Sequence, residues 1–181
     1  DRGALAVQIA THYREAGQDA DAASYFRLAG ERARALFANS EALTHLETAL
    51  ALGHPDPASL HEAIGDLHTL QGAYTAALRA YETAAALSAP DSVARLEWKL
   101  SGVYARRGDW DLAEGHLANA LATWDETGLV AERASAYADW SLIVRRQGGQ
   151  ARAQDLAEQA LALALESHDV GALAKARNML G

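Results

Sequence analysis

Apolar residues recur along most of the chain at intervals of three or four positions, the spacing that places them on one face of an α-helix. Val93, Leu96, Leu100 and Val103 form one such stripe. No segment alternates apolar and polar residues over a sustained stretch, so the pattern predicts no β-strand. Glycines and prolines interrupt the stripes and divide the chain into predicted helices. These are expected over residues 3–16, 19–37, 39–52, 57–71, 74–88, 91–107, 110–124, 128–147, 150–166 and 170–180.

A pair of residues recurs within these helices: an Ala is followed four positions later by a large apolar residue. The pairs are Ala22/Phe26, Ala42/Leu46, Ala77/Tyr81 and Ala113/Leu117, with Ala153/Ala157 as a weaker copy. From Ala42 onward the pairs lie 35, 36 and 40 residues apart, which is typical of helical solenoids with two helices per repeat. Ala22 and Ala42 are only 20 residues apart, so the helix at 19–37 is expected to close the first pair and open the second. Residues 1–181 are predicted to form one continuous repeat array.

The best-matching repeat runs from Leu60 to Pro90. In order, it contains Ile64-Gly65, His68, Gly72, Ala77, Tyr81 and Ala84. This order resembles the tetratricopeptide repeat (TPR), in which a Trp-x2-Leu-Gly-x2-Tyr helix is followed by an Ala-x3-Phe helix. The resemblance implies an all-α fold: a right-handed α-solenoid, or superhelix, of antiparallel helix pairs with about ten helices. The sequence departs from the family at His61, His68 and Val144, which stand where aromatic residues are usual.

A narrower resemblance concerns the first third of the chain. The residues from His12 to Gly17, from Ala29 to Ala33 and from Glu41 to Leu43 are similar to the start of repeat regions in large bacterial ATPase-linked transcription regulators and cyclase-type signalling proteins. It implies a fragment of a longer protein whose role is a non-catalytic protein- or peptide-binding scaffold, the interaction or sensor segment of a signalling or transcriptional regulator. Two alternatives stay open: a sensor for a small molecule or signalling peptide, and a structural module that packs on its parent or on itself.

Composition and charge narrow the function classes. The chain has 16 Lys and Arg against 24 Asp and Glu, a formal charge of −8, which disfavours nucleic acid and anionic membranes as partners of this segment. It has no Cys, which excludes thiolate catalysis and Cys-ligated metals. About a quarter of its residues are Ala, so helices are expected to approach closely. No leader or membrane span is apparent, and the expected location is the cytoplasm.

No catalytic, cofactor or metal site is predicted. His61 and His68 lie two helical turns apart, too far to chelate one ion without a third ligand, and His61-Glu62 lacks the second His of the zinc-protease pattern. The acidic residues have the pattern of a solvated surface. The chain is therefore expected not to be an enzyme.

In the TPR family the first helix of each pair lines a concave groove. The candidate partner-binding residues on that wall are Glu62, Asp66, Trp98, Arg106, Arg145 and Arg146. Arg suits bidentate recognition of carboxylate or phosphate, although Arg near a helix C-terminus also complements the helix dipole. Trp98 lies beside its helix stripe and is expected either to anchor a partner or to pack on the neighbouring first helix. The Lys and Asn with which some family members grip a C-terminal carboxylate are absent from the matching positions.

The last predicted helix, 170–180, resembles the first helix of an unfinished repeat. It is expected to expose Leu173, Met179 and Leu180, and a homodimer through this terminal helix is a further expectation.

Overall fold

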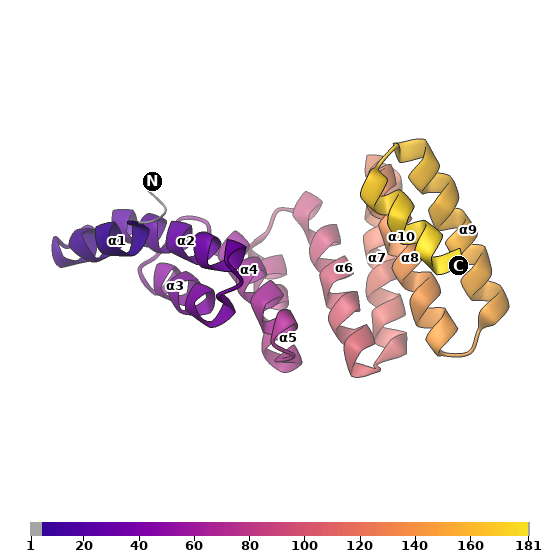
Figure 1. Ribbon diagram of the computed structural model, residues 1–181, viewed down its shortest axis with the longest axis horizontal. Coiled ribbons are helices and arrows are strands. Elements are labelled where there is room, and N and C mark those ends of the chain that lie inside the picture. Colours follow the sequence, from indigo (N-terminus) through magenta and orange to yellow (C-terminus); the bar gives the residue numbers. More distant parts are fainter. Residues whose placement is uncertain (1–4, 181) are drawn as a thin grey trace. The chain divides into compact units, whose positions relative to one another are not determined.

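The computed structural model describes residues 5–180, and over that range it is all-α, with no strand. The helices are α1 (Ala6–Glu15), α2 (Asp19–Ala35), α3 (Asn39–Ala51), α4 (Pro57–Leu70), α5 (Tyr74–Leu87), α6 (Pro90–Arg107), α7 (Trp110–Thr127), α8 (Val130–Arg146), α9 (Gln150–Ser167) and α10 (Val170–Leu180). Figure 1 shows them in chain order. All ten helices predicted from the apolar pattern are therefore confirmed, most bounds agreeing within two residues. Residues 3 and 4 of the first predicted helix lie outside the described residues.

The chain divides into two compact units, residues 1–88 with α1–α5 and residues 89–181 with α6–α10. Within the first unit, α2 packs against both α1 and α3, and α4 packs against α5. The shared role of the 19–37 helix is thus confirmed. Within the second unit α6 pairs with α7 and α8 with α9, and α10 lies against both α8 and α9. That residues 1–181 act as one continuous array stays a prediction.

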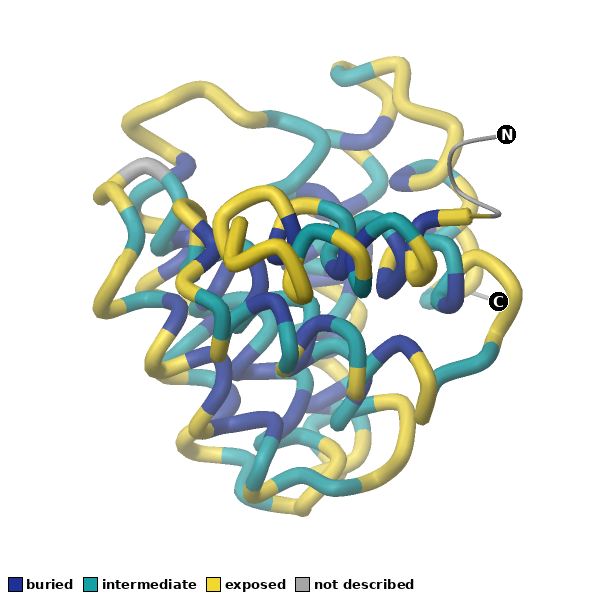
Figure 2. Tube along the Cα trace, turned by 90° about the vertical axis from the view of Figure 1, so that its left-hand side faces the viewer, coloured by how far each residue is buried: buried dark blue, intermediate teal, exposed yellow. Residues whose placement is uncertain are grey.

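Small residues let these helices approach closely. Each Ala of the recurring pairs is buried, as is its large apolar partner at Phe26, Leu46, Tyr81 or Leu117. Gly30 of α2 has no room for a side chain, because a Cβ there would lie 2.7 Å from the Leu46 side chain of α3. Figure 2 shows the buried positions as short blue segments that alternate with exposed ones along the helices. The core is therefore built on Ala and Gly at the contacts, with larger side chains filling the spaces between them.

Several helices end at a glycine in the left-handed conformation: Gly17, Gly72, Gly108 and Gly148 have φ between 73° and 91°. The α2–α3 turn is different. Phe37 takes the left-handed position there with φ 60° and is 87% exposed. The helix expected to reach residue 37 consequently ends at Ala35.

The terminal helix corrects one expectation. Leu180 is exposed, but Leu173 and Met179 are half-buried and pack on a cluster of small residues from α8, α9 and α10 that includes Ala138 and Ala176. The contacts of α10 with two neighbouring helices explain the difference. Among the described residues, no helix is both long and apolar enough to cross a lipid bilayer.

Candidate functional site

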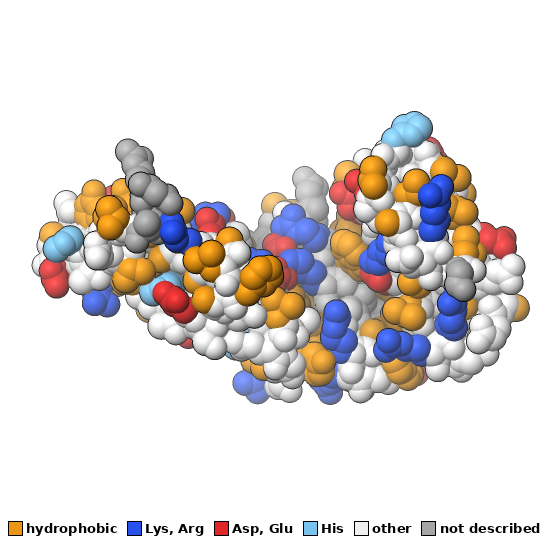
Figure 3. All heavy atoms as spheres, viewed as in Figure 1, with side chains coloured by type: hydrophobic (Ala, Val, Ile, Leu, Met, Phe, Trp, Pro, Cys, Tyr) orange, Lys and Arg blue, Asp and Glu red, His pale blue; other side chains and the backbone are white. Residues whose placement is uncertain are grey.

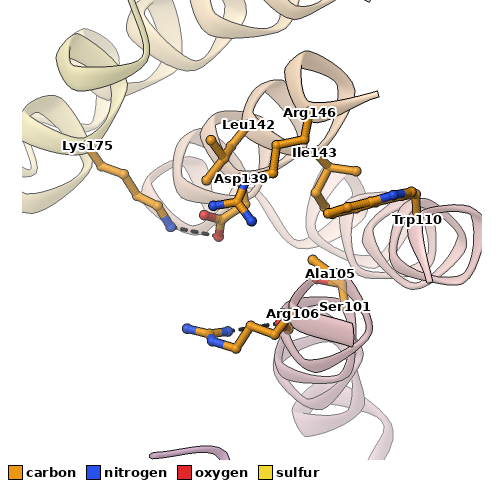
Figure 4. A pocket seen from close by; sticks show the side chains of 10 residues that line it. Ser101, Ala105, Arg106, Trp110, Asp139, Leu142, Ile143, Arg146 and Lys175 are labelled. Carbon is orange, nitrogen blue, oxygen red and sulfur yellow. Dashed lines mark hydrogen bonds and ion pairs between the residues drawn. The ribbon is translucent and has the colours of Figure 1, made fainter. Parts of the chain in front are cut away.

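A cavity of about 330 Å³ opens in the second unit between α6, α8 and α10, with Trp110 of α7 on its wall. Its polar lining includes Arg106, Asp139, Arg146 and Lys175, and its apolar lining includes Trp110 and Ile143. Figure 4 shows the charged groups of Asp139 and Lys175 meeting on one side of the pocket, with Trp110 on the opposite side. The cavity thus has a charged side and an apolar side.

Helical spacing explains how the pocket is built. Asp139, Leu142 and Arg146 follow one another at steps of three and four along α8, so they lie on one face of that helix. On α6 the facing residues are Ser101, Gly102 and Ala105, whose small side chains leave space in front of Arg106. In the space-filling view several Lys and Arg side chains lie on the face of this unit that is turned to the viewer (Figure 3).

Three helices are joined beside the pocket through one carboxylate. The indole Nε1–H of Trp98 on α6 donates to Asp139 Oδ2 on α8 at 2.8 Å, and Lys175 Nζ on α10 donates to the same oxygen at 2.7 Å. Lys175 Nζ also lies 5.0 Å from the centre of the Trp98 ring, a cation–π distance. The rings of Trp98 and Trp124 on α7 form a T-shaped pair, with ring centres 5.7 Å apart and planes at 78°. The contact of Trp98 with Asp139 agrees with its expected packing on the neighbouring first helix, and a role of Trp98 in anchoring a partner stays a prediction.

Two of the six candidate residues share the pocket. Arg106 and Arg146 are both exposed and both line it, while Trp98 contacts its lining residues Asp139 and Lys175. Arg106 Nη1 donates to the Gly102 carbonyl at 2.9 Å.

The structure does not bring Arg145 to this pocket. Its guanidinium donates to the carbonyl oxygen of Met179 on α10, and it lines a separate hollow with Gln150 and Gln154. Because consecutive residues on a helix point about 100° apart, the two Arg of the 145–146 pair face different surroundings.

Glu62 and Asp66 lie on α4 in the first unit. Asp66 Oδ1 accepts a hydrogen bond from the Tyr81 hydroxyl at 2.8 Å, and Asp66 Oδ2 lies 3.4 Å from Arg34 Nη2. Burial raises the pKa of Tyr81 above its usual range, and the Asp66 charge adds to this, so the phenol stays protonated and acts as the donor. Asp66 is thus already engaged in contacts between helices of its own unit.

Three residues that line the pocket were not among the candidates predicted from the sequence: Asp139, Lys175 and Trp110. A signal for Asp139 was present: it precedes Arg146 by seven positions, which is two helical turns and therefore the same face. No local pattern singles out Lys175, because its partner lies 36 residues earlier in the chain.

Over the described residues, no group of three or more His, Asp or Glu side chains is arranged to hold a metal ion. His61 and His68 are both half-buried on α4, and burial lowers the pKa of His61, which favours its neutral form.

A protein-family model matches the sequence within the second unit. Residues 92–166 match the tetratricopeptide repeat model. No curated protein sequence matches the chain.

Several solved structures resemble the whole chain in fold. Aspartyl phosphate phosphatase F from Bacillus subtilis matches with a TM-score of 0.79 at 13% identity, over 98% of this chain and 52% of that one. YrrB, described as a TPR protein with an unusual peptide-binding site, matches with a TM-score of 0.64 at 15% identity, over 96% and 90%. MamA from Desulfovibrio magneticus RS-1, from position 41 to its end, matches with a TM-score of 0.68 at 16% identity, over 93% and 98%. This chain spans about half the length of the phosphatase. The predicted all-α, TPR-like solenoid is thereby confirmed, and residues 92–166 carry the match to the tetratricopeptide repeat model itself.

Proposed function

We propose that the chain is a non-catalytic scaffold that binds a protein or peptide partner. The observation that carries this proposal is the pocket between α6, α8 and α10, which combines exposed Arg side chains with an apolar wall on the first helices of successive repeats. Helical repeats of this kind recognise extended peptides through such surfaces. YrrB, a TPR protein of similar fold, has a peptide-binding site, which supports the same type of function.

The wider setting we propose is the cytoplasm of a bacterium, where the chain forms the interaction or sensor segment of a signalling or transcriptional regulator. The resemblance of residues 12–17 and 29–33 to such regulators supports this setting, together with a helix α2 that serves both α1 and α3. A test is a transcription reporter driven by the full-length parent protein. Replacing Arg106 and Arg146 by Glu should change the reporter output several-fold, whereas an unaltered response would contradict the proposed role.

Partner binding itself is tested by selection from a displayed random peptide library. Wild-type chain should enrich related sequences, and these should lose binding to the Arg106→Glu, Arg146→Glu double variant. Arg79→Glu is the matched control, because Arg79 is an exposed residue of α5 that lies outside the pocket. Enriched peptides that bind the wild type, the double variant and Arg79→Glu equally would show that the binding site lies outside α6 and α8. A library that yields no related sequences would contradict peptide binding.

A small effector is the second candidate, and the size of the cavity favours it. Its volume of about 330 Å³ lies at the lower end of the range for small-molecule sites. A thermal-shift screen of metabolites should then raise the melting temperature of the wild type and leave that of the Arg double variant unchanged. Equal shifts in both proteins would contradict a ligand at this pocket.

A further inference from the structure

The pocket lining carries more positive than negative side chains, although the chain as a whole is acidic. Acidic residues outnumber basic ones by 24 to 16 in the whole sequence. In the pocket lining, three cationic side chains, Arg106, Arg146 and Lys175, face a single carboxylate, Asp139. A local excess of positive charge on an acidic protein attracts anions to that place and not to the rest of the surface.

The contacts divide these four charges into two sets. Lys175 and Asp139 neutralise each other through their 2.7 Å ion pair, and Asp139 is further engaged by Trp98. Arg106 uses one N–H on the uncharged Gly102 carbonyl, which leaves its charge uncompensated. Arg146 has no hydrogen-bond or ion-pair partner within residues 5–180. Two guanidinium groups are therefore available to an anion, each with several N–H donors.

Apart from Ser101, whose hydroxyl donates to the Trp98 carbonyl at 2.7 Å, the rest of the lining carries no polar side chain. Trp110, Leu142 and Ile143 contribute to the wall, with the methyl group of Ala105 on the facing helix. A free inorganic anion would leave this surface without a contact, whereas a ligand that joins an anionic group to an apolar one would use both.

We propose that this pocket takes a peptide segment in which an acidic residue stands beside a large apolar residue. The carboxylate binds between Arg106 and Arg146, and the apolar side chain packs on Trp110 and Ile143. This inference rests on the proposed peptide-binding function and specifies its ligand. A phosphorylated side chain offers the same anionic chemistry to Arg, so the test includes it as a separate arm.

The probes are acetylated and amidated hexapeptides of glycine with two variable central positions, titrated into 15N-labelled protein and followed by NMR. The central pairs are glutamate–phenylalanine, glutamine–phenylalanine, glutamate–glycine and phosphoserine–phenylalanine. The glutamate–phenylalanine peptide should bind about tenfold more tightly than the glutamine–phenylalanine and glutamate–glycine peptides, and should shift the Nε–Hε signals of Arg106 and Arg146. The Arg106→Gln, Arg146→Gln variant should lose about tenfold in affinity, while Arg79→Gln should leave it unchanged.

Asp139→Asn should strengthen peptide binding, whereas the substitutions of Arg106 and Arg146 should weaken it. Asp139→Asn removes the negative charge of the lining and leaves the charge of Lys175 uncompensated, while an amide oxygen can still accept from Trp98 and Lys175. The glutamate–phenylalanine peptide should therefore bind several-fold more tightly. Damage to the fold would weaken binding instead. Should this variant fail to fold, the comparison of glutamate with glutamine on the wild type decides the question alone.

Three results would overturn the inference. They are equal binding of the glutamate and glutamine peptides, weaker binding to a folded Asp139→Asn variant, and binding of the phosphoserine peptide without the glutamate one. If the displayed library meanwhile enriches neutral or basic peptides that need Arg106 and Arg146, peptide binding stands and only the ligand class is wrong. If neither the probe peptides nor the library peptides bind, the proposed peptide-binding function and the proposed ligand class are both wrong.

Discussion

At the scale of single residues, the contact between α4 and α5 leaves no room for a side chain at Gly65. A Cβ on Gly65 of α4 would lie 2.5 Å from Cε1 of Tyr81 on α5, whereas a Cβ on Gly115 of α7 would meet nothing within 4 Å. Gly65→Ala should therefore lower the free energy of unfolding by about 2 kcal/mol through overpacking. Gly115→Ala, at an exposed helical position, should raise it by up to about 1 kcal/mol. Urea denaturation measures both, and a Gly65→Ala protein as stable as wild type would show that the two helices separate easily.

Phe37 has a backbone conformation that is unfavourable for a residue with a side chain. It holds a left-handed conformation that most of the other such turns give to Gly, His168 being the exception. Its ring is 87% exposed, so little packing offsets the cost of this conformation. Phe37→Gly should raise the free energy of unfolding by about 0.5 kcal/mol, after the greater flexibility of Gly in the unfolded chain is deducted. Gly72→Ala, at φ 74°, should lower it by about 1 kcal/mol. A clear loss of stability in Phe37→Gly would mean that the exposed ring makes a stabilising contact.

Asp56 makes stability depend on pH at the start of α4. Hydrogen bonds from the hydroxyl and the backbone N–H of Ser59 lower the pKa of Asp56 below its ordinary value of 3.8. Because the pKa is lower in the folded state, the contribution of the carboxylate is fully present above pH 4 and disappears as the pH falls through the folded-state pKa.

Asp56→Ala should therefore cost about 1 kcal/mol at pH 7. Its difference from wild type should shrink in acid. Asp56→Asn keeps a capping oxygen and should lose less at pH 7. Chemical denaturation at pH 7 and at pH 3 provides the measurement, and a deficit of Asp56→Ala that grows in acid would contradict this sign.

At the scale of elements, the carboxylate of Asp139 connects α6, α8 and α10. Replacing it by Ala removes the acceptor for both Trp98 and Lys175, so Asp139→Ala should lower the free energy of unfolding by about 2 kcal/mol. Asp155→Ala is the control, since Asp155 is an exposed residue of α9 and should change stability little. Equal effects of the two variants would show that the link between the helices contributes nothing.

The elements also show what the sequence could predict. The apolar stripes, the recurring Ala and the turn glycines are local signals, and they placed ten helices and the buried faces correctly. The end of the second helix was predicted too late, at residue 37, because a left-handed aromatic residue such as Phe37 has no sequence signature. The hydrogen bond of Trp98 was not predicted because its partner Asp139 lies 41 residues away. Helical spacing alone points Arg145 and Arg146 in different directions, but the contact of Arg145 with Met179 on α10 required the structure. Local pattern thus predicts the helices, while side-chain partners between repeats require the structure.

At the scale of the whole molecule, self-association through the terminal helix is the remaining prediction. Leu180 and Val170 of α10 are exposed, at 41% and 80%, as is Leu165 of α9. If this end pairs two copies, Leu180→Glu should convert a dimer into a monomer in light scattering coupled to size exclusion. A wild-type chain that stays monomeric at about 100 μM, a concentration at which weak dimers form, would contradict the prediction.

The proposed binding of a peptide through the pocket of the second unit should change the exchange of backbone amides in the helices that line it. Hydrogen–deuterium exchange of the wild type, with and without a peptide selected from the displayed library, tests this most directly. Exchange should slow in α6, α8 and α10, whose residues line the pocket, and should change little in α1–α5. Protection confined to α9 or to the first unit would contradict it.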